Sequence, residues 1–352
     1  MESPKSSSLG NSLLVPSVQE LIKTQIDSVP SRYLRPDLVD HPISVADVPV
    51  VDLGKLIDEA TMDSELAVLH SACKDWGFFQ LVNHGVSSTL VENMKTQVQE
   101  FFYLPMEEKQ KLWQLPGEME GFGQAFVVSE EQKLDWADVF FLVTQPPHLR
   151  KPHLLPKLPL PFRDTLENYS LEVRNLAAQV LDHMAKALQM KPEEMKDIFS
   201  GNVRQTMRTN YYPPCPEPDK VIGFTPHSDG TGLTILLQVN EVEGLQIKKD
   251  GQWVAVKVLP NDFVVNVGDI LEMITNGVYR SIEHRATVNS EKERLSIACF
   301  HSPRFDGEIY PAPSLVTGDR PALFRNVSVK EFFRGFFSRE IQGKAYLDTL
   351  RI

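Results

Sequence analysis

The chain changes texture after residue 200, where short β-rich segments follow one another with turn signals between them. The turns are rich in Asn, Asp and Gly, as at Asp250-Gly251 and Asn276-Gly277. Seven short strands at this spacing indicate a β-sandwich or a jelly roll. The expected strands are 206–212, 233–239, 245–248, 253–258, 263–267, 279–288 and 294–300.

Helical periodicity dominates the remainder of the chain, with apolar residues repeating every three or four positions. Strands are expected only at 48–53 and 78–83, and the first 45 residues are expected to pack as a polar tail on the surface. We therefore predict an α+β protein, in which a β core of about 100 residues is embraced by helices. The expected helices are 56–75, 87–103, 161–189 and 327–339.

The composition disfavours some classes of binding partner. The 352 residues include 47 acidic and 36 basic side chains, a formal net charge of −11. Such a surface repels phosphate groups, so binding to nucleic acids or to anionic membranes is not expected. No apolar run approaches the length of about 20 residues that a membrane span needs. Three cysteines without a CxxC motif, and no visible secretory signal, predict a cytoplasmic protein.

A metal site is the strongest chemical signal. His227 and Asp229 are separated by one residue, so in an extended segment they project from the same face. A third ligand is expected from another strand. His284 lies in the alternating segment 279–286, and its competitor Glu283 should point to the opposite face of that strand. Two histidines and one carboxylate leave open positions on an octahedral ion, as in non-haem Fe(II) oxygenases, whereas a structural zinc ion would need a fourth protein ligand.

An anion site is indicated ten residues after His284. Arg294 and Ser296 again share one strand face, and a guanidinium beside a hydroxyl suits a carboxylate. The alternative is an edge-strand arginine in a surface salt bridge, which the charged residues at 291–293 make plausible. Asn210 and Tyr212 add an amide and a phenol at the end of another strand.

These motifs together resemble the plant 2-oxoglutarate/Fe(II)-dependent dioxygenase family, and the resemblance covers nearly the whole chain. It rests on His227-x-Asp229, His284 after 54 further residues, Arg294-x-Ser296 after nine more, and the preceding 210–216 run NYYPPCP. The segment 76–85, WGFFQLVNHG, is similar to the family's N-terminal signature. The stretches 132–136 and 240–246 are similar to the senescence-related-gene-like branch, which includes alkaloid O-demethylases and a norcoclaurine-synthase-like protein.

The resemblance implies a double-stranded β-helix core, with a helical region 1–200, an Fe(II)/2-oxoglutarate-binding core 201–303 and a helical extension 304–352. It implies Fe(II), 2-oxoglutarate and O₂ as cofactor and cosubstrates, ascorbate as a reductant, and a monomer that acts on a small molecule. The metal ligands would be His227, Asp229 and His284. The residues that bind 2-oxoglutarate would be Arg294, Ser296, Tyr212 and Asn210.

Candidate substrate-pocket residues, by their positions in the family pattern, are Val139, Phe141, Arg208, Phe300 and Ser302. They predict an apolar, ring-containing plant metabolite, an alkaloid or a phenolic, that is hydroxylated or O-demethylated. Flavonoid-oxidising relatives tend to have a tyrosine at position 139 and an acid at 302, so a flavonoid is less favoured. Three rival functions remain open: an ascorbate-dependent oxidase, a metal-dependent condensing enzyme of the norcoclaurine-synthase type, and a non-enzymatic metal-binding scaffold.

Overall fold

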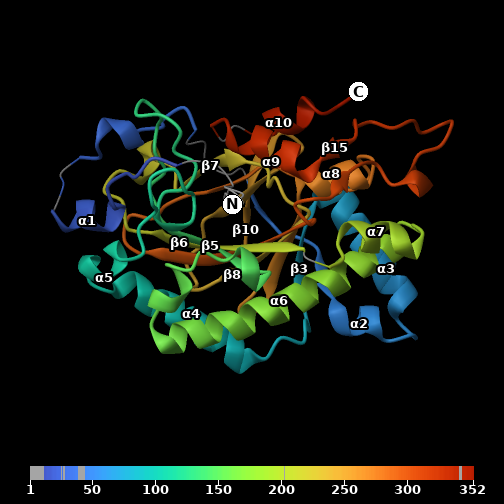
Figure 1. The fold of residues 1–352 in the computed structure, drawn as a ribbon, viewed down its shortest axis with the longest axis horizontal. Helices are drawn as coiled ribbons and strands as arrows, with labels where there is room; N and C mark the ends of the chain where they lie inside the picture. The colour runs from blue at the N-terminus through green and yellow to red at the C-terminus, as the bar shows by residue number, and fades with distance from the viewer. Residues whose placement is uncertain (1–11, 25, 27, 39–43, 202, 341–342) are drawn as a thin grey trace, which may run out of the picture.

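A computed structural model describes residues 12–24, 26, 28–38, 44–201, 203–340 and 343–352. Figure 1 shows the strands in the centre of the molecule, with the long helix α6 (Leu160–Ala187) and helix α4 (Ser88–Tyr103) along one side. The C-terminal helices α9 (Val329–Phe337) and α10 (Ala345–Asp348) lie over the opposite side. No helix in the described part of the chain is long and apolar enough to cross a membrane.

Two sheets form the core. The large sheet has the strand order β2-β3-β11-β8-β13-β6-β5-β4. Its strands are Val50–Asp52, Phe78–Val82, Phe263–Val267, Leu233–Gln238, Arg294–Ser302, Arg204–Tyr212, Asp138–Gln145 and Gly121–Gly123, in that order. The small sheet has the order β1-β10-β9-β12-β7. Its strands are Ser44–Ala46, Gln252–Val256, Leu245–Lys249, His284–Ala286 and Phe224–His227. A separate pair joins β14 (Glu308–Ile309) to β15 (Val327–Ser328).

The helices bury amphipathic stripes against the large sheet. On α6 the buried positions recur at helical spacing, so one face of the helix lies on the core while the other meets solvent. These positions include Leu166, Val173, Leu176, Val180 and Met184. The remaining helices are α1 (Val18–Lys23), α2 (Leu53–Ile57), α3 (Met62–Ser71), α5 (Met106–Gln110), α7 (Pro192–Ile198) and α8 (Asp269–Ile274).

The predicted α+β architecture with a jelly-roll core is confirmed. The predicted helix 56–75 is wrong in detail, because the chain forms α2, a turn and α3 instead, followed by a π-helical turn over Ala72–Trp76. The hydroxyl of Thr61 donates to the carbonyl of Lys55, and the carboxylate of Asp58 accepts from the N–H of Ala60. These local side-chain bonds satisfy backbone groups that a continuous helix would have used.

The predicted strand 279–288 is also shorter than expected, since only His284–Ala286 pairs in a sheet. The N–H of Ser281 donates to the carboxylate of Glu272, at 2.7 Å, and the N–H of Tyr279 donates to the hydroxyl of Thr275, at 3.2 Å. The side chains of Glu272, in α8, and of Thr275, just after it, therefore accept the backbone hydrogen bonds that a neighbouring strand would otherwise accept. Helix α8 itself falls where the sequence indicated only a turn at Gly268-Asp269.

The N-terminal segment is anchored more deeply than a surface tail. Val18 is fully buried, in a cluster that also contains Trp136. The buried carboxylate of Asp138, on β5, accepts hydrogen bonds from the hydroxyl of Ser17 (2.7 Å), the N–H of Val18 (2.8 Å) and the N–H of Gln19 (3.0 Å). Asp138 thus binds the start of α1 and fixes it to the large sheet.

We expect Asp138→Ala to lower the free energy of unfolding by about 3 kcal/mol, because two backbone N–H groups and a hydroxyl lose a charged acceptor in a buried site. Urea unfolding monitored by tryptophan fluorescence measures the change. Asp306→Ala, at an exposed carboxylate, is the matched control and should shift stability by less than about 0.5 kcal/mol. Equal effects of both substitutions would contradict the anchoring role.

Candidate metal centre and adjoining chambers

Three predicted ligand side chains meet between the two sheets. Strands β7 and β12 pair antiparallel with His227 directly opposite His284, and Asp229 follows β7 by two residues. The Oδ1 atom of Asp229 lies 3.5 Å from Nε2 of His227 and 3.7 Å from Nε2 of His284. The ligand atoms of the three residues all lie within 4.8 Å of one another. No other group of three potential ligands is found among the described residues.

Hydrogen bonds on the far side of each ligand fix its orientation. Nδ1 of His227 lies 2.8 Å from the carbonyl of Thr225, and Nδ1 of His284 lies 3.1 Å from the carbonyl of Ile282. A carbonyl can only accept, so each Nδ1 carries the proton and each Nε2 presents a lone pair to the centre. Burial and the neighbouring His227 lower the pKa of His284 to about 4, which favours the neutral imidazole that a metal ion requires.

Asp229 is held in the same manner. Its Oδ2 atom accepts from the hydroxyl of Thr234 at 2.6 Å and from the amide of Asn266 at 2.7 Å, while Oδ1 faces the histidines. Burial alone would raise the pKa of Asp229, but the positive charge that His284 and His227 carry when protonated, together with the Asn266 amide, outweighs burial and holds the pKa below its usual range. The site therefore combines one anionic oxygen with two neutral nitrogens, a donor set that suits Fe(II).

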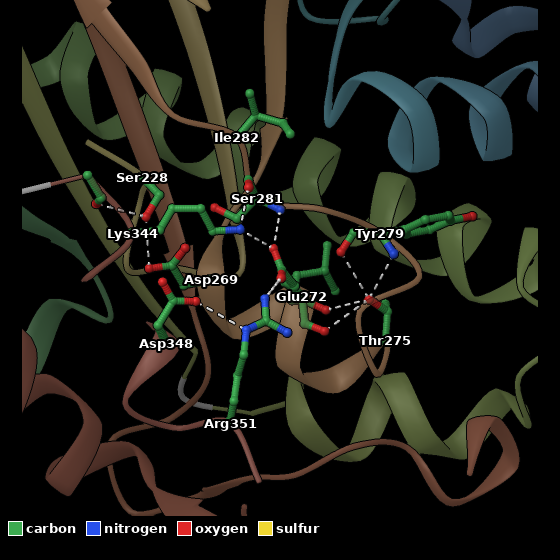
Figure 2. Close-up of polar contacts among 12 residues, drawn as sticks. Ser228, Asp269, Glu272, Thr275, Tyr279, Ser281, Ile282, Lys344, Asp348 and Arg351 are labelled. Atoms are coloured by element: carbon green, nitrogen blue, oxygen red, sulfur yellow. Dashed lines mark hydrogen bonds and ion pairs between the residues drawn. The ribbon is translucent and has the colours of Figure 1, made fainter. Parts of the chain in front are cut away.

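A polar network around helix α8 includes Ser228, Asp269 and Glu272 (Figure 2). Ser228 lies between His227 and Asp229 in the sequence, and its hydroxyl donates to Oδ2 of Asp269 at 3.1 Å. The N–H of Asp269 donates to the carbonyl of Asp229 at 2.7 Å. Burial raises the pKa of Asp269 to about 7, against the lowering effects of Ser281 and other neighbours. The N-terminus of α8 thus supports the loop that carries Asp229.

The C-terminal segment joins this network through Glu272. Figure 2 shows Lys344 and Arg351 converging on the Glu272 carboxylate, at 2.6 and 2.8 Å. Lys344 also donates to the carbonyl of Ser281, at 2.7 Å, and the next residue is Ile282, whose carbonyl orients His284. Residues far apart in the sequence therefore fix the backbone that positions His284.

A second group of predicted residues lies on the inner face of the large sheet. Arg294 pairs in register with Tyr212, and Ser296 with Asn210, whose amide donates to the Ser296 hydroxyl at 3.2 Å. Arg294 is 2% exposed, so it is not a surface salt-bridge residue. Its Nε and Nη1 atoms have no hydrogen-bond partner in the described part of the chain. A buried guanidinium with unmet donors fits a carboxylate ligand such as an end of 2-oxoglutarate.

Gly244 gives Arg294 the space that it occupies. A Cβ atom at position 244 would lie 2.8 Å from Cδ of Arg294 and 2.9 Å from the carbonyl of Thr287. Only glycine permits so close an approach of this loop, so the position of Arg294 depends on a residue 50 positions away in the sequence.

Two chambers meet at the ligand cluster. The first, here called the Arg294 chamber, is lined by the three potential ligands together with Arg294, Ser296, Asn210 and Tyr212. The second, here called the aromatic chamber, is lined by His227 and Asp229 and by rings from several elements. These rings are Phe126, Phe141, Phe224, Phe300, Phe333, Phe336 and Phe337. A metal ion at the cluster would therefore face a polar chamber that can hold one small molecule and an apolar chamber that can hold another.

Four of the five predicted substrate-pocket residues line the aromatic chamber, namely Phe141, Arg208, Phe300 and Ser302. Val139 is not among the lining residues, and it lies in the apolar cluster that includes Phe141. The Nε atom of Arg208 donates to Oδ1 of Asn210 at 2.6 Å, and its guanidinium lies 3.8 Å from the centre of the Phe224 ring.

The contribution of α9 to the site was not predicted from the sequence. Phe333, Phe336 and Phe337 lie at spacings of three and four residues, so a helical stripe was readable from the sequence. Nothing local shows that this stripe covers the metal cluster instead of an ordinary core. Arg208 was the one charged residue among the predicted pocket residues, and the structure adds Arg204 to the same wall.

Comparison with known proteins identifies the family. The profile of the 2OG-Fe(II) oxygenase superfamily matches residues 203–303, and that of the non-haem dioxygenase in morphine synthesis N-terminal domain matches residues 48–158. Protein SRG1 of Arabidopsis thaliana is 60% identical over 97% of this chain and 98% of its own length. The chain belongs to the 2OG-Fe(II) oxygenase superfamily. It is accordingly a 2-oxoglutarate-dependent dioxygenase, and the predicted resemblance to the senescence-related-gene-like branch is confirmed.

Other relatives carry more specific names. Oxoglutarate-dependent flavonoid 7-O-demethylase 1 of Ocimum basilicum is 53% identical, over 99% of this chain and 94% of that protein. Codeine O-demethylase of Papaver somniferum is 52% identical, over the full length of both. The crystal structure of JOX2 in complex with 2OG, Fe and JA superposes with a TM-score of 0.87 and 34% identity, over 96% of this chain and 98% of JOX2.

We expect Thr234→Val to weaken metal binding ten- to a hundredfold, because the Asp229 carboxylate loses one of the two hydrogen bonds that orient it. Titration of the metal-free protein with Mn(II), followed by calorimetry, measures the affinity. Thr96→Val, on the exposed face of α4, is the control for loss of a threonine hydroxyl. An unchanged affinity in Thr234→Val would show that Asn266 alone suffices to orient the ligand.

Proposed function

We propose that His227, Asp229 and His284 hold Fe(II) and that the enzyme oxidises an apolar small molecule with 2-oxoglutarate and O₂. The observation that carries this proposal is the convergence of two Nε2 atoms and one carboxylate oxygen on a single buried point. Both Nδ1 atoms and the second carboxylate oxygen are bonded outward, so the inward atoms have no other role within the described residues. When bound, the metal would couple decarboxylation of 2-oxoglutarate to oxidation of a substrate carbon.

The residues of the Arg294 chamber would bind 2-oxoglutarate. The Arg294 guanidinium offers donors to the carboxylate that is remote from the metal. Ser296 lies two residues further along the same strand, so its hydroxyl is on the same face. Asn210 positions Ser296 through its amide, and the Tyr212 ring lies 5.2 Å from the Arg294 guanidinium carbon. Burial of this chamber excludes water and strengthens the ionic contact.

The aromatic chamber would hold the primary substrate. Rings such as Phe141, Phe300 and Phe336 offer a wide apolar wall, which suits a flat ring system. Val139 would not contact the substrate directly but would support Phe141, with which it shares an apolar cluster. We infer hydroxylation or O-demethylation of an alkaloid or phenolic, supported by relatives named as demethylases of codeine and of a flavonoid.

Two alternatives receive some support. A flavonoid substrate is favoured by the relative from Ocimum basilicum, although Val139 and Ser302 differ from the residues that flavonoid-oxidising relatives tend to have. A condensing enzyme is favoured by S-norcoclaurine synthase 1 of Coptis japonica, which is 43% identical over 98% of this chain. A condensation would proceed without O₂ and without release of succinate, so succinate formation separates it from oxidation.

We further infer that the protein is a cytoplasmic monomer that uses ascorbate to keep its iron reduced. The three cysteines, Cys73, Cys215 and Cys299, are buried and form no disulfide, which suits a reducing compartment. Size-exclusion chromatography with light scattering tests the oligomeric state, and omission of ascorbate from the assay tests the reductant.

The decisive assay measures succinate release, with Fe(II) and 2-oxoglutarate, against a panel of benzylisoquinoline and tropane alkaloids, flavonoids, coumarins and gibberellin-like acids. We expect stoichiometric succinate and oxidised product for at least one ring-containing compound. Formaldehyde in equal amount would identify O-demethylation. Product formation without O₂ would support the condensing alternative.

We expect His227→Ala, Asp229→Ala and His284→Ala each to abolish turnover at ordinary iron concentration, since an open site with three ligands loses most of its metal affinity when one is removed. Circular dichroism should show an intact fold, because apolar strands elsewhere build the core. Full activity in any one of the three variants would remove that residue from the ligand set.

We expect Arg294→Lys to raise the KM for 2-oxoglutarate about ten- to a hundredfold, which corresponds to about 1.5–3 kcal/mol for a hydrogen bond to a charged group. Lysine keeps the charge but loses the two-pronged geometry. The KM for the primary substrate should change much less, and steady-state kinetics with each substrate varied in turn measures both. Similar increases in the two KM values would point to a structural role for Arg294.

A further inference from the structure

Arg204 lies at the opposite end of the ladder that carries Arg294. Strands β6 and β13 pair over nine residues, from Arg294 opposite Tyr212 to Ser302 opposite Arg204. Alternate residues of a strand share one face, so Arg204 projects to the same side as Thr206 and Arg208. All three line the aromatic chamber. The inner face of one strand pair therefore has a guanidinium at each end.

The charge of Arg204 is buried without an anionic partner among the described residues, and its one recorded contact is the Phe305 ring, whose centre lies 5.8 Å from the guanidinium carbon. The residue is 4% exposed, and its Nε and Nη1 atoms have no hydrogen-bond partner among the described residues. Burial lowers its pKa to about 10, an effect that the carboxylate of Glu120 partly opposes, so the side chain remains a cation at neutral pH. Glu120 itself accepts a hydrogen bond from the N–H of Val143 at 2.8 Å, and no ion pair within 4.0 Å joins it to Arg204.

A buried guanidinium with unmet donors is costly, because its desolvation is repaid only by an anionic or hydrogen-bonding partner. Arg294 has the same two unmet atoms, Nε and Nη1, in the chamber where a carboxylate is expected. The same physical reasoning therefore assigns an anion to Arg204. That anion must come from a ligand of the aromatic chamber, since Arg204 lines this chamber and not the Arg294 chamber.

The surroundings of Arg204 suit an amphiphilic ligand. Thr206 and Ser302 offer hydroxyl groups beside it, and Phe300 pairs in register with Thr206. Phe300 also pairs with Thr234, whose hydroxyl orients the ligand Asp229. Arg204 lies two residues beyond this level, about 7 Å along the strand, so one small molecule can reach from the metal cluster to the guanidinium.

We propose that Arg204 is a specificity-determining residue that binds a carboxylate of the primary substrate. This rests on the proposed function and narrows its substrate class to an apolar ring system with an acidic group remote from the oxidised carbon. The rings of the aromatic chamber bind the apolar body, Thr206 and Ser302 assist the carboxylate, and the carbon to be oxidised faces the metal cluster. A carboxylate suits the planar guanidinium better than a neutral carbonyl does, because two charge-assisted hydrogen bonds form at once.

Calorimetry with matched probes tests the proposal. The protein is loaded with Mn(II) and saturating 2-oxoglutarate, so that Arg294 is occupied, and is titrated with benzoate, 3-phenylpropanoate and naphthalene-2-acetate and with their methyl esters. We expect at least one acid to bind ten times more tightly than its ester, or better, and this preference to disappear in Arg204→Gln. Arg204→Lys should retain part of it. Equal binding of acids and esters by the wild-type protein, or an unchanged preference in Arg204→Gln, overturns the proposal.

Two controls separate the possible failures. Arg304→Gln removes an exposed arginine beside Asp306 and should keep the full preference for acids. Arg204→Gln without ligand should unfold at the same temperature as the wild type or higher, because it removes a buried unpaired charge, whereas a large fall would show that Arg204 serves the fold through Glu120 and would overturn the proposal. Failure of the wild-type protein to bind 2-oxoglutarate in the loading step would refute the proposed function, and not this inference alone.

Discussion

A buried carboxylate between two imidazoles is the constraint on which the arrangement of the centre depends. Asp229 has one oxygen directed at His227 and His284, and the other is bonded to Thr234 and Asn266. Those partners lie on β8 and β11 of the large sheet, whereas the histidines lie on β7 and β12 of the small sheet. One ionised side chain therefore couples the two layers of the jelly roll, and packing of the layers fixes the ligand geometry.

Each of the two chambers is lined by an arginine whose Nε and Nη1 atoms have no hydrogen-bond partner among the described residues. Arg294 and Arg204 mark the ends of one strand ladder, and the metal cluster lies where the two chambers meet. A buried guanidinium group without an anionic partner reduces stability, so two such groups in the chambers indicate ligand binding more than a role in folding. In the proposed function, this separation would give one end to the carboxylate of 2-oxoglutarate and would leave the other end to select the primary substrate.

The C-terminal segment completes both the support and the wall of the site. Lys344 and Arg351 neutralise the buried Glu272 and hold the backbone next to Ile282 (Figure 2). Helix α9, a few residues earlier, contributes Phe333 and Phe336 to the aromatic chamber. Since one segment performs both roles, a change in its position would alter the wall of the aromatic chamber and the orientation of His284 together.

The sequence by itself determined the β core, the amphipathic helices and the residues proposed to bind metal and 2-oxoglutarate. These signals are local: alternation places His227 and Asp229, or Arg294 and Ser296, on one face of a strand, and helical spacing defines the stripe of α6. Strand 279–288 was overestimated because its apparent alternation could not show that Glu272 would take the backbone bonds of Ser281.

Only the tertiary structure decided which faces meet across the core. Arg204 lies just before the predicted strand 206–212, and its burial opposite Ser302, without an anionic partner among the described residues, follows from the register of β6 and β13. The rings of α9 read equally well as core residues until the fold places them over the metal cluster. Contacts of this kind join residues about 100 or more positions apart, and their free energy depends on the partner across the chamber, which no local pattern encodes.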